Sequence, residues 1–230
     1  MKKAPAGRLL PLARAGYPFI LVSLGAGLAA LALGWPKTAF LALAAAAFFA
    51  FFFRDPERHP PADEEAIVAP ADGRVIRVDR LLDEEVGPAW RVATFMNLFD
   101  VHVNRSPAAG TVVTSRHVPG RFLAAFREEA DTANERQVTV LTTDSGARLK
   151  VVQIAGLLAR RILPAVRPGD RLTRGQRLGM ICFGSRVDVY LPRECEILAR
   201  TGDRLTAGET PVARWRSGQK VSPGGEAGEG

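Results

Sequence analysis

The pair Gly184-Ser185 lies between two strand-like apolar runs late in the chain, and it has the residue types that backbone self-cleavage needs. A serine hydroxyl can attack the carbonyl directly before it, and glycine leaves that carbonyl without a shielding side chain. A Gly-Ser pair is also common in turns. The self-cleavage hypothesis therefore depends on which other residues accompany the pair.

Three other polar positions could assist such chemistry. Asp72 sits in an Asp-Gly turn after a strand-like run, and His102 lies in an apolar, strand-like segment that ends at a proline. Residues 134–136 (NER) form a third polar group. Each also has a plain structural interpretation: a turn-forming aspartate, a buried core histidine and a solvated charged turn.

Metal chemistry has little support in the sequence. The three histidines are His59, His102 and His117, and no two have the close spacing of a metal site on one helix or strand. Cys182 and Cys195 form no Cys-x-x-Cys motif and lie in apolar surroundings. We expect both to be buried free thiols, which fits a reducing compartment.

Two apolar runs open the chain. Residues 17–35 contain 19 uncharged residues and residues 38–53 contain 16, with Pro36-Lys37 between them. A membrane-spanning helix needs about 20 residues. Basic residues flank both outer ends, so the positive-inside rule predicts a transmembrane helical hairpin over 1–53 with both ends in the cytoplasm. A cleaved signal peptide would explain only the first run, and a re-entrant hairpin is a further alternative.

The charge is divided unevenly between this segment and the rest. The net charge is +7, and residues 1–53 hold five of the 31 basic residues and none of the 24 acidic ones. The remainder therefore has 26 basic and 24 acidic residues and is nearly balanced. No basic run interleaved with aromatic residues occurs there, which argues against nucleic-acid binding.

After a linker over 54–65, residues 66–216 show short apolar runs separated by Gly, Pro and Asp turns. This pattern predicts a mainly β (α+β) catalytic domain with antiparallel strands, and short helices or ordered loops at 122–133 and 156–163. Residues 217–230 are rich in glycine and predict a disordered tail. The turn glycines of 166–181 resemble the barrel-sandwich of biotinyl carriers, but that segment lacks the lysine that carriers need.

The chain resembles the phosphatidylserine decarboxylases of the short, archaeal-like bacterial type. The resemblance rests on five motifs that occur in the family's order and cover most of the chain. They are 52–56 (FFRDP), 69–73 (APADG), 100–107 (DVHVNRSP), 134–136 (NER) and 183–188 (FGSRVD).

The resemblance implies a self-processing enzyme that converts phosphatidylserine to phosphatidylethanolamine. Serinolysis between Gly184 and Ser185 would give fragments 1–184 and 185–230, which stay associated. Ser185 would become a pyruvoyl group that forms a Schiff base with the substrate amine, so neither a metal nor pyridoxal phosphate is required. His102 and Asp72 are the candidates for acid–base work, with Asp72 orienting and charging the imidazole.

One position departs from the family pattern. Longer members carry a second histidine three residues after the first, and here that position is Arg105. The base for self-cleavage is therefore left open between His102, His117 and another group.

The resemblance also implies a dimer whose catalytic domain works on a phospholipid at the cytoplasmic face of the inner membrane. Two other functions remain open at this stage. One is decarboxylation of a related serine lipid, archaetidylserine. The other is a non-enzymatic, membrane-tethered barrel-sandwich adaptor, although such adaptors usually carry heptad-patterned helices that this chain lacks.

Overall fold

The computed structural model describes residues 11–127, 129–157, 161–182 and 185–216. The chain forms two compact units, Met1–Glu57 and Arg58–Gly230. Gly184 and the expected tail at 217–230 lie outside the described residues.

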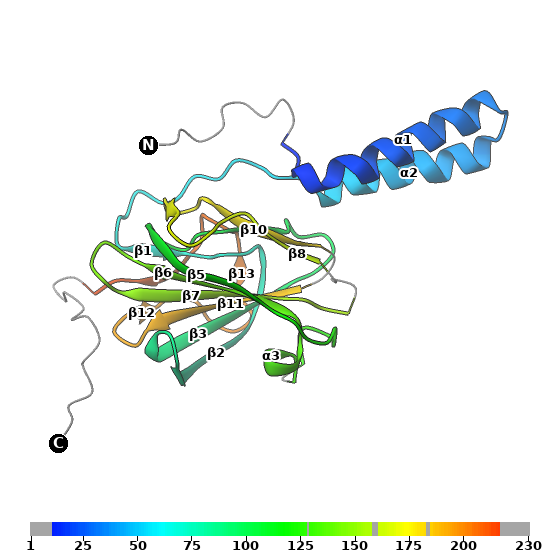
Figure 1. Cartoon of the computed structure of the whole chain (residues 1–230). Coiled ribbons are helices and arrows are strands. Elements are labelled where there is room, and N and C mark those ends of the chain that lie inside the picture. The colour runs from blue at the N-terminus through cyan, green and yellow to red at the C-terminus, as the bar shows by residue number, and fades with distance from the viewer. Residues whose placement is uncertain (1–10, 128, 158–160, 183–184, 217–230) are drawn as a thin grey trace, which may run out of the picture. The chain divides into compact units, whose positions relative to one another are not determined.

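The first unit is a helical hairpin. A short 3-10 helix, η1 (Arg14–Gly16), leads into α1 (Tyr17–Ala32), which lies beside α2 (Pro36–Phe52) (Figure 1). The rings of Phe19 and Phe49 are 5.3 Å apart, and Gly27 lets Leu43 approach closely. The predicted pair of helices is therefore present.

Crossing of a membrane is a separate matter. Among the described residues, Arg14–Ala32 is the one helical segment long and apolar enough to span a bilayer, and only 17% of its most apolar window is buried. At 17 residues, α2 is shorter. The transmembrane hairpin therefore stays a prediction.

Within its described residues, the second unit is built almost entirely of antiparallel strands and carries one short helix, α3 (Ala130–Ala133). The strands are β1 (Ala66–Val68), β2 (Gly73–Asp83), β3 (Gly87–Met96), β4 (Val103–Arg105), β5 (Gly110–Val118), β6 (Arg136–Thr142), β7 (Arg148–Ile154), β8 (Arg161–Pro164), β9 (Arg171–Leu172), β10 (Arg177–Cys182), β11 (Ser185–Pro192), β12 (Glu196–Ile197), β13 (Arg204–Leu205) and β14 (Pro211–Arg214).

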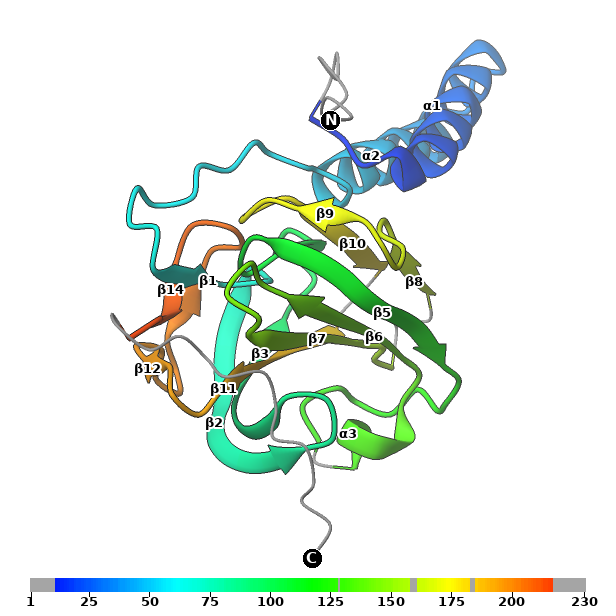
Figure 2. The same cartoon turned by 60° about the vertical axis from the view of Figure 1, so that its left-hand side comes forward.

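Eight strands form one sheet in the order β13-β2-β3-β11-β7-β6-β5-β9. Two three-stranded sheets, β1-β14-β12 and β4-β10-β8, complete the unit. The large sheet curls into a half-barrel (Figures 1 and 2). The mainly antiparallel β domain is thus confirmed, whereas the closer likeness to a barrel-sandwich remains a prediction.

Alternation along the strands separates an inner from an outer face of the large sheet. Val187, Val189 and Leu191 of β11 pack into the main hydrophobic core, as do Leu149 and Val151 of β7. Residues between them in sequence point to the outer face, because side chains alternate along a strand. The inner face is therefore apolar, and polar side chains on it call for an explanation.

Two local expectations can be compared with the structure. The turns around Gly169 and Gly175 have φ of 90° and 77°, a conformation that favours glycine. The end of the segment 156–163 is part of strand β8 rather than a helix, because it pairs with β10. That pairing partner lies 15 or more residues later in the chain.

Candidate active site

Ser185 is the first residue of β11, which lies between β3 and β7 in the middle of the large sheet. It pairs with Met96, the last residue of β3, and like Val187 it points to the inner face. Ser185 is fully buried, and its Oγ has no hydrogen-bond partner within the described part of the chain. A buried unpartnered hydroxyl costs about 1–3 kcal/mol, so it marks a position kept for something other than stability.

His102 lies in the loop between β3 and β4 and is fully buried. Its Nδ1 is 2.9 Å from the carbonyl oxygen of Asp100. A carbonyl can only accept, so Nδ1 carries the hydrogen, and Nε2 carries the lone pair of the neutral ring. This tautomer suits a general base.

The backbone of His102 lies beside the strand that leads to the Gly184-Ser185 junction. The His102 carbonyl accepts a hydrogen bond from the Ile181 N–H of β10 at 3.3 Å. The following strand β4 continues this pairing with β10. The β3–β4 loop therefore connects the strand that pairs with Ser185 to β4, the partner of the strand that precedes the junction.

Asp72 lies in the turn between β1 and β2. Its Oδ1 accepts a hydrogen bond from the Ala207 N–H at 2.8 Å, and its Oδ2 lies 2.9 Å from Nη2 of Arg58. The backbone N–H of Val101 also lies near this carboxylate and favours its charged form. Burial raises the pKa of Asp72 above its usual value, while Ala207, Arg58 and Val101 act against that shift.

The structure thus brings Asp72 close to the His102 segment, because Val101 directly precedes His102. It also places His102 next to β10. Ser185 is linked to the same region through Met96, its pairing partner, which ends β3 directly before the loop that carries His102.

Asp100, the first residue of the motif 100–107, organises this loop. Its carboxylate is fully buried, accepts the Asn97 N–H at 2.8 Å and is paired with Arg204. Its carbonyl sets the His102 tautomer. A loop carboxylate with a structural role leaves no signal in sequence that distinguishes it from a turn residue.

Arg105 holds the position at which longer family members have a histidine, and it serves a structural purpose. Its Nη1 donates to the Gly175 carbonyl at 2.9 Å, and its N–H donates to the Pro70 carbonyl at 2.9 Å. A guanidinium stays protonated at all physiological pH values. Arg105 therefore cannot replace the missing histidine as a base.

His117 is far from the junction. It lies half-exposed on β5, where its Nε2 is 3.7 Å from Glu135. Strands β6 and β7 separate β5 from β11, so a strand spacing of about 4.8 Å puts His117 roughly 14 Å from β11. Of the two histidines considered as the base, the fold favours His102.

Asn134 is fully buried rather than part of a solvated turn. Its Nδ2 donates to the carbonyls of Leu123 and Ala155, both at 2.8 Å, and its Oδ1 accepts the Leu123 N–H at 2.9 Å. Asn134 therefore ties the loop before α3 to the end of β7. Its described contacts give it a structural function.

Sequence reasoning missed a buried pair of amides on the inner face. Gln153 of β7 donates to Asn104 Oδ1 at 2.8 Å, and Asn104 Nδ2 is 3.5 Å from Met96 Sδ. Both amides are fully buried, and Gln153 Oε1 has no partner among the described residues. The signal in the sequence is a glutamine where the alternation of Leu149 and Val151 calls for an apolar residue.

A second missed group lies on the outer face. Arg186, directly after Ser185, is fully buried and makes two contacts with Asp188, at 2.7 and 2.5 Å. Its Nη1 is 2.6 Å from Asp131 of α3, and Asp131 also contacts Arg91 at 2.7 Å. These ion pairs fix the residue that follows the junction.

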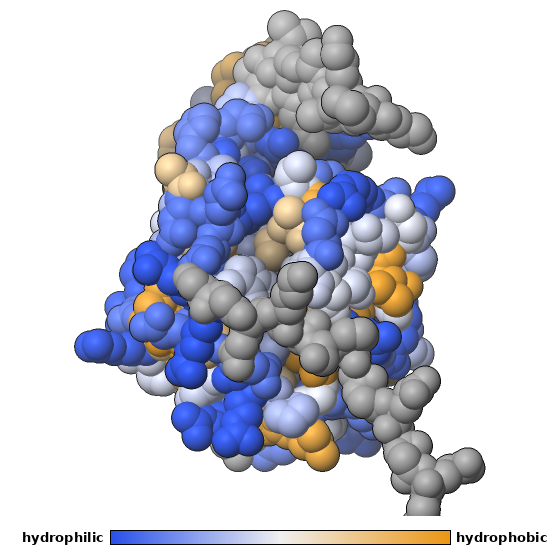
Figure 3. Space-filling model, turned by 90° about the vertical axis from the view of Figure 1, so that its left-hand side faces the viewer, coloured by the Kyte–Doolittle hydropathy of each residue, from blue (hydrophilic) through white to orange (hydrophobic). Residues whose placement is uncertain are grey.

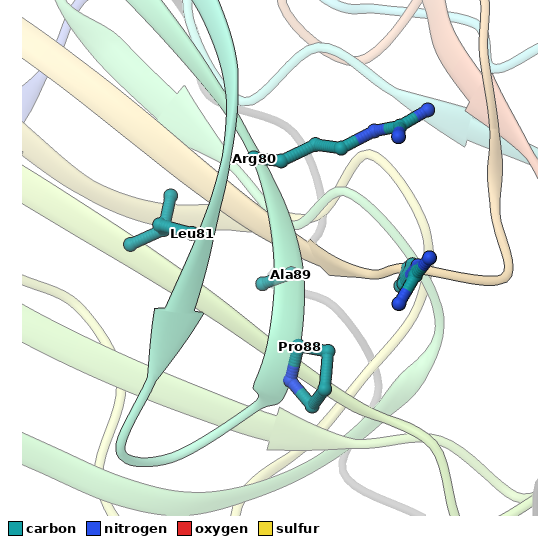
Figure 4. A pocket seen from close by; sticks show the side chains of 5 residues that line it. Arg80, Leu81, Pro88 and Ala89 are labelled. Carbon is teal, nitrogen blue, oxygen red and sulfur yellow. The ribbon is translucent and has the colours of Figure 1, made fainter.

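A surface hollow of about 310 Å³ lies elsewhere (Figure 4). Arg80, Leu81, Pro88, Ala89 and Arg193 line it. Ala89 pairs with Pro192, seven residues beyond Ser185, which is about 24 Å along the strand. The hollow is therefore separate from the Ser185 site. On the face of the β domain drawn in Figure 3, hydrophilic residues predominate and apolar ones form small separate groups.

Within the described ranges, no three His, Cys, Asp or Glu side chains are grouped as metal ligands would be. Cys182 and Cys195 are buried free thiols, as the sequence predicts, and burial raises the pKa of both.

Comparison with known proteins assigns the family. The model of the phosphatidylserine decarboxylase family matches residues 45–213, most of the chain. The chain belongs to the phosphatidylserine decarboxylase family. A non-enzymatic adaptor does not fit this membership.

Curated relatives in the family are similar over nearly their whole length. The phosphatidylserine decarboxylase proenzyme of Gluconacetobacter diazotrophicus is 48% identical over 208 residues, covering 87% of this chain and 92% of the relative. That of Symbiobacterium thermophilum is 46% identical, covering 88% and 95%. The putative archaetidylserine decarboxylase proenzyme of Methanothermobacter thermautotrophicus is also 46% identical, covering 81% and 89%.

Proposed function

We propose that this chain decarboxylates phosphatidylserine to phosphatidylethanolamine with a pyruvoyl group made from its own Ser185. The observation that carries the proposal is the buried, unpartnered hydroxyl of Ser185 at the first position of a central strand. The family and the names of its relatives support the activity and the processing of a proenzyme. Ser185 is the residue that would both cleave the chain and then, as the pyruvoyl group, bind the substrate.

The maturation begins when Ser185 Oγ attacks the Gly184 carbonyl, which converts the amide into an ester. His102 takes the hydroxyl proton through Nε2. Loss of the Ser185 α-proton then expels the Gly184 carboxylate and leaves a dehydroalanine. Tautomerisation and hydrolysis by one water release ammonia and leave the ketone.

The residues around Ser185 fit such a group. On the same inner face, Gln153 holds a buried amide whose Nε2 donates to Asn104, and its Oε1 has no partner among the described residues and could accept a hydrogen bond from the substrate nitrogen. In the mature enzyme the ketone would condense with the substrate amine and lose water, and the resulting imine would accept the electron pair that stays behind when carbon dioxide leaves. His102 is then the acid that returns a proton to the product, and Asp72 orients the loop that carries it.

The two fragments are expected to stay together after cleavage. Strand β11 begins the 185–230 fragment and lies between β3 and β7, both of which belong to the 1–184 fragment. Its pairs with β3 run from Ser185 to Pro192. Cutting the chain before Ser185 removes none of these hydrogen bonds.

A membrane location suits a lipid substrate. The apolar α1 and the basic residues around the hairpin favour an anchor whose flanking ends face the cytoplasm at the inner membrane. Assembly as a dimer is a further expectation that rests on the family alone. Archaetidylserine is a second candidate substrate, because a relative named for that lipid is 46% identical.

Denaturing electrophoresis of purified protein, with an assay on defined lipids, tests the proposal. We expect two fragments, 1–184 and 185–230, and carbon dioxide release from phosphatidylserine. The variant Ser185→Ala should remain a single inactive chain. An uncut, fully active wild-type protein would refute the proposal, whereas activity on archaetidylserine alone would change only the substrate.

A further inference from the structure

Arg58, the first residue of the second compact unit, makes its closest ionic contact with Asp72. Its Nη2 is 2.9 Å from Oδ2 and 3.2 Å from Oδ1 of Asp72. Both side chains are only 14% exposed, so solvent and salt screen their interaction weakly. Arg58 belongs to the linker over 54–65, and nothing in the sequence connects this linker with the site around His102 and Asp72.

The surroundings of Asp72 need such a cation. Burial disfavours the charged carboxylate, and the nearby Asp100 adds a second negative charge from the β3–β4 loop. Arg204 is paired with Asp100 rather than with Asp72. Among the described contacts of Asp72, the cationic side chain is Arg58. The Ala207 N–H donates a hydrogen bond to the carboxylate, and the nearby Val101 backbone also favours its charged form.

We propose that Arg58 is a positioning residue that keeps Asp72 ionised and fixed against the loop carrying His102. The inference rests on the proposed function, because Asp72 matters only if His102 does acid–base work. Without Arg58, the buried carboxylate beside Asp100 would take up a proton at a higher pH. An uncharged Asp72 would attract the Val101 N–H less strongly, and the His102 segment would lose part of what holds it in place.

A purely structural explanation can be separated from this one. Arg58 Nη1 also lies 3.3 Å from Glu209, and the His59 N–H donates to Glu209 at 3.0 Å. These contacts hold the linker against the β domain without involving Asp72. Glu209→Gln therefore weakens the linker contacts but leaves the Arg58–Asp72 ion pair, and it is a matched control for Arg58→Gln.

The experiment compares wild type, R58Q, R58K and E209Q as full-length proteins in detergent micelles with phosphatidylserine. The extent of self-cleavage is read from gels, and decarboxylation by the cleaved fraction is followed as a function of pH. An opposite charge at this distance changes the pKa of an aspartate by about 1–3 units. Losing Arg58 raises the pKa of Asp72, so the acid limb of the R58Q profile should move up by at least about one pH unit.

On the acid limb, R58Q should decarboxylate roughly tenfold more slowly than wild type at the same pH. At pH values well above the limb, the two rates should agree within about twofold. E209Q should keep the wild-type limb. R58K retains the positive charge, so its acid limb should shift by less than half a pH unit. If R58Q does not fold, the R58K profile tests the inference by itself. An unshifted R58Q, an equal shift in E209Q or a full-unit shift in R58K would overturn the inference. Failure of the proposed function would instead appear as uncut, inactive wild type.

Discussion

At the scale of single residues, the sequence identified Ser185, His102 and Asp72 as candidates, because serine after glycine and an isolated histidine are local signals. It could not identify the Asn104–Gln153 pair. Those amides are 49 residues apart and meet only because β4 and β7 face the same interior. Polar contacts across a core depend on topology, which local patterns do not specify.

The amide pair makes a testable contribution to stability. In the uncut Ser185→Ala background, Gln153→Leu leaves Asn104 Oδ1 buried without its donor, which should lower the free energy of unfolding by about 1–3 kcal/mol. Replacing both residues by leucine removes the donor and the acceptor together. Chemical denaturation should therefore find the double variant more stable than Gln153→Leu. Additive losses would contradict a coupled pair.

At the scale of elements, strands with local apolar patterns were predicted well. The short apolar runs that the sequence shows over 66–216 include 66–68 (AIV) and 148–154 (RLKVVQI), and these form β1 and β7. Strand β8 was not predicted, because its partner β10 follows a long loop and its own four residues carry little pattern. The short helix α3 is held by the ion pairs of Asp131, and ion pairs between distant segments are not visible in sequence.

Those ion pairs predict how stability depends on pH. Burial alone would raise the pKa of Asp131, but Arg186 and Arg91 outweigh burial and lower it below 3.8. Ionised Asp131 therefore stabilises the fold at neutral pH, and this contribution is lost as the pH falls through the lowered pKa. In the Ser185→Ala background, Asp131→Asn should lower the melting temperature at pH 7, and the difference should shrink in acid. A difference independent of pH would contradict the charge-based explanation.

At the scale of the whole molecule, the sequence predicted an apolar segment followed by a β domain, and the structure contains both as separate compact units. Composition is sufficient for that division because apolar helices and alternating strands have different hydrophobic periods. The position of the membrane relative to the β domain does not follow from such patterns.

The membrane anchor can be tested on α1. Leu21 and Leu28 are 62% and 56% exposed in the hairpin. Replacing both by lysine costs about 2.5–3.5 kcal/mol for each charge placed at the centre of a bilayer. Carbonate extraction should leave the wild type in the membrane pellet and release the double variant, which should still cut itself. Leu82→Lys, at an exposed position of the β domain, is the control. Equal partitioning of all three proteins would contradict the anchor.

The most direct test of the account is the intact mass of the small fragment from purified wild-type protein. If Ser185 becomes the pyruvoyl group, the fragment 185–230 is one ammonia lighter than the same peptide with an unmodified serine. It should also lack a free amine and react with a carbonyl reagent such as a hydrazine. A fragment that begins with an ordinary serine, or an uncut chain in active protein, would contradict the account.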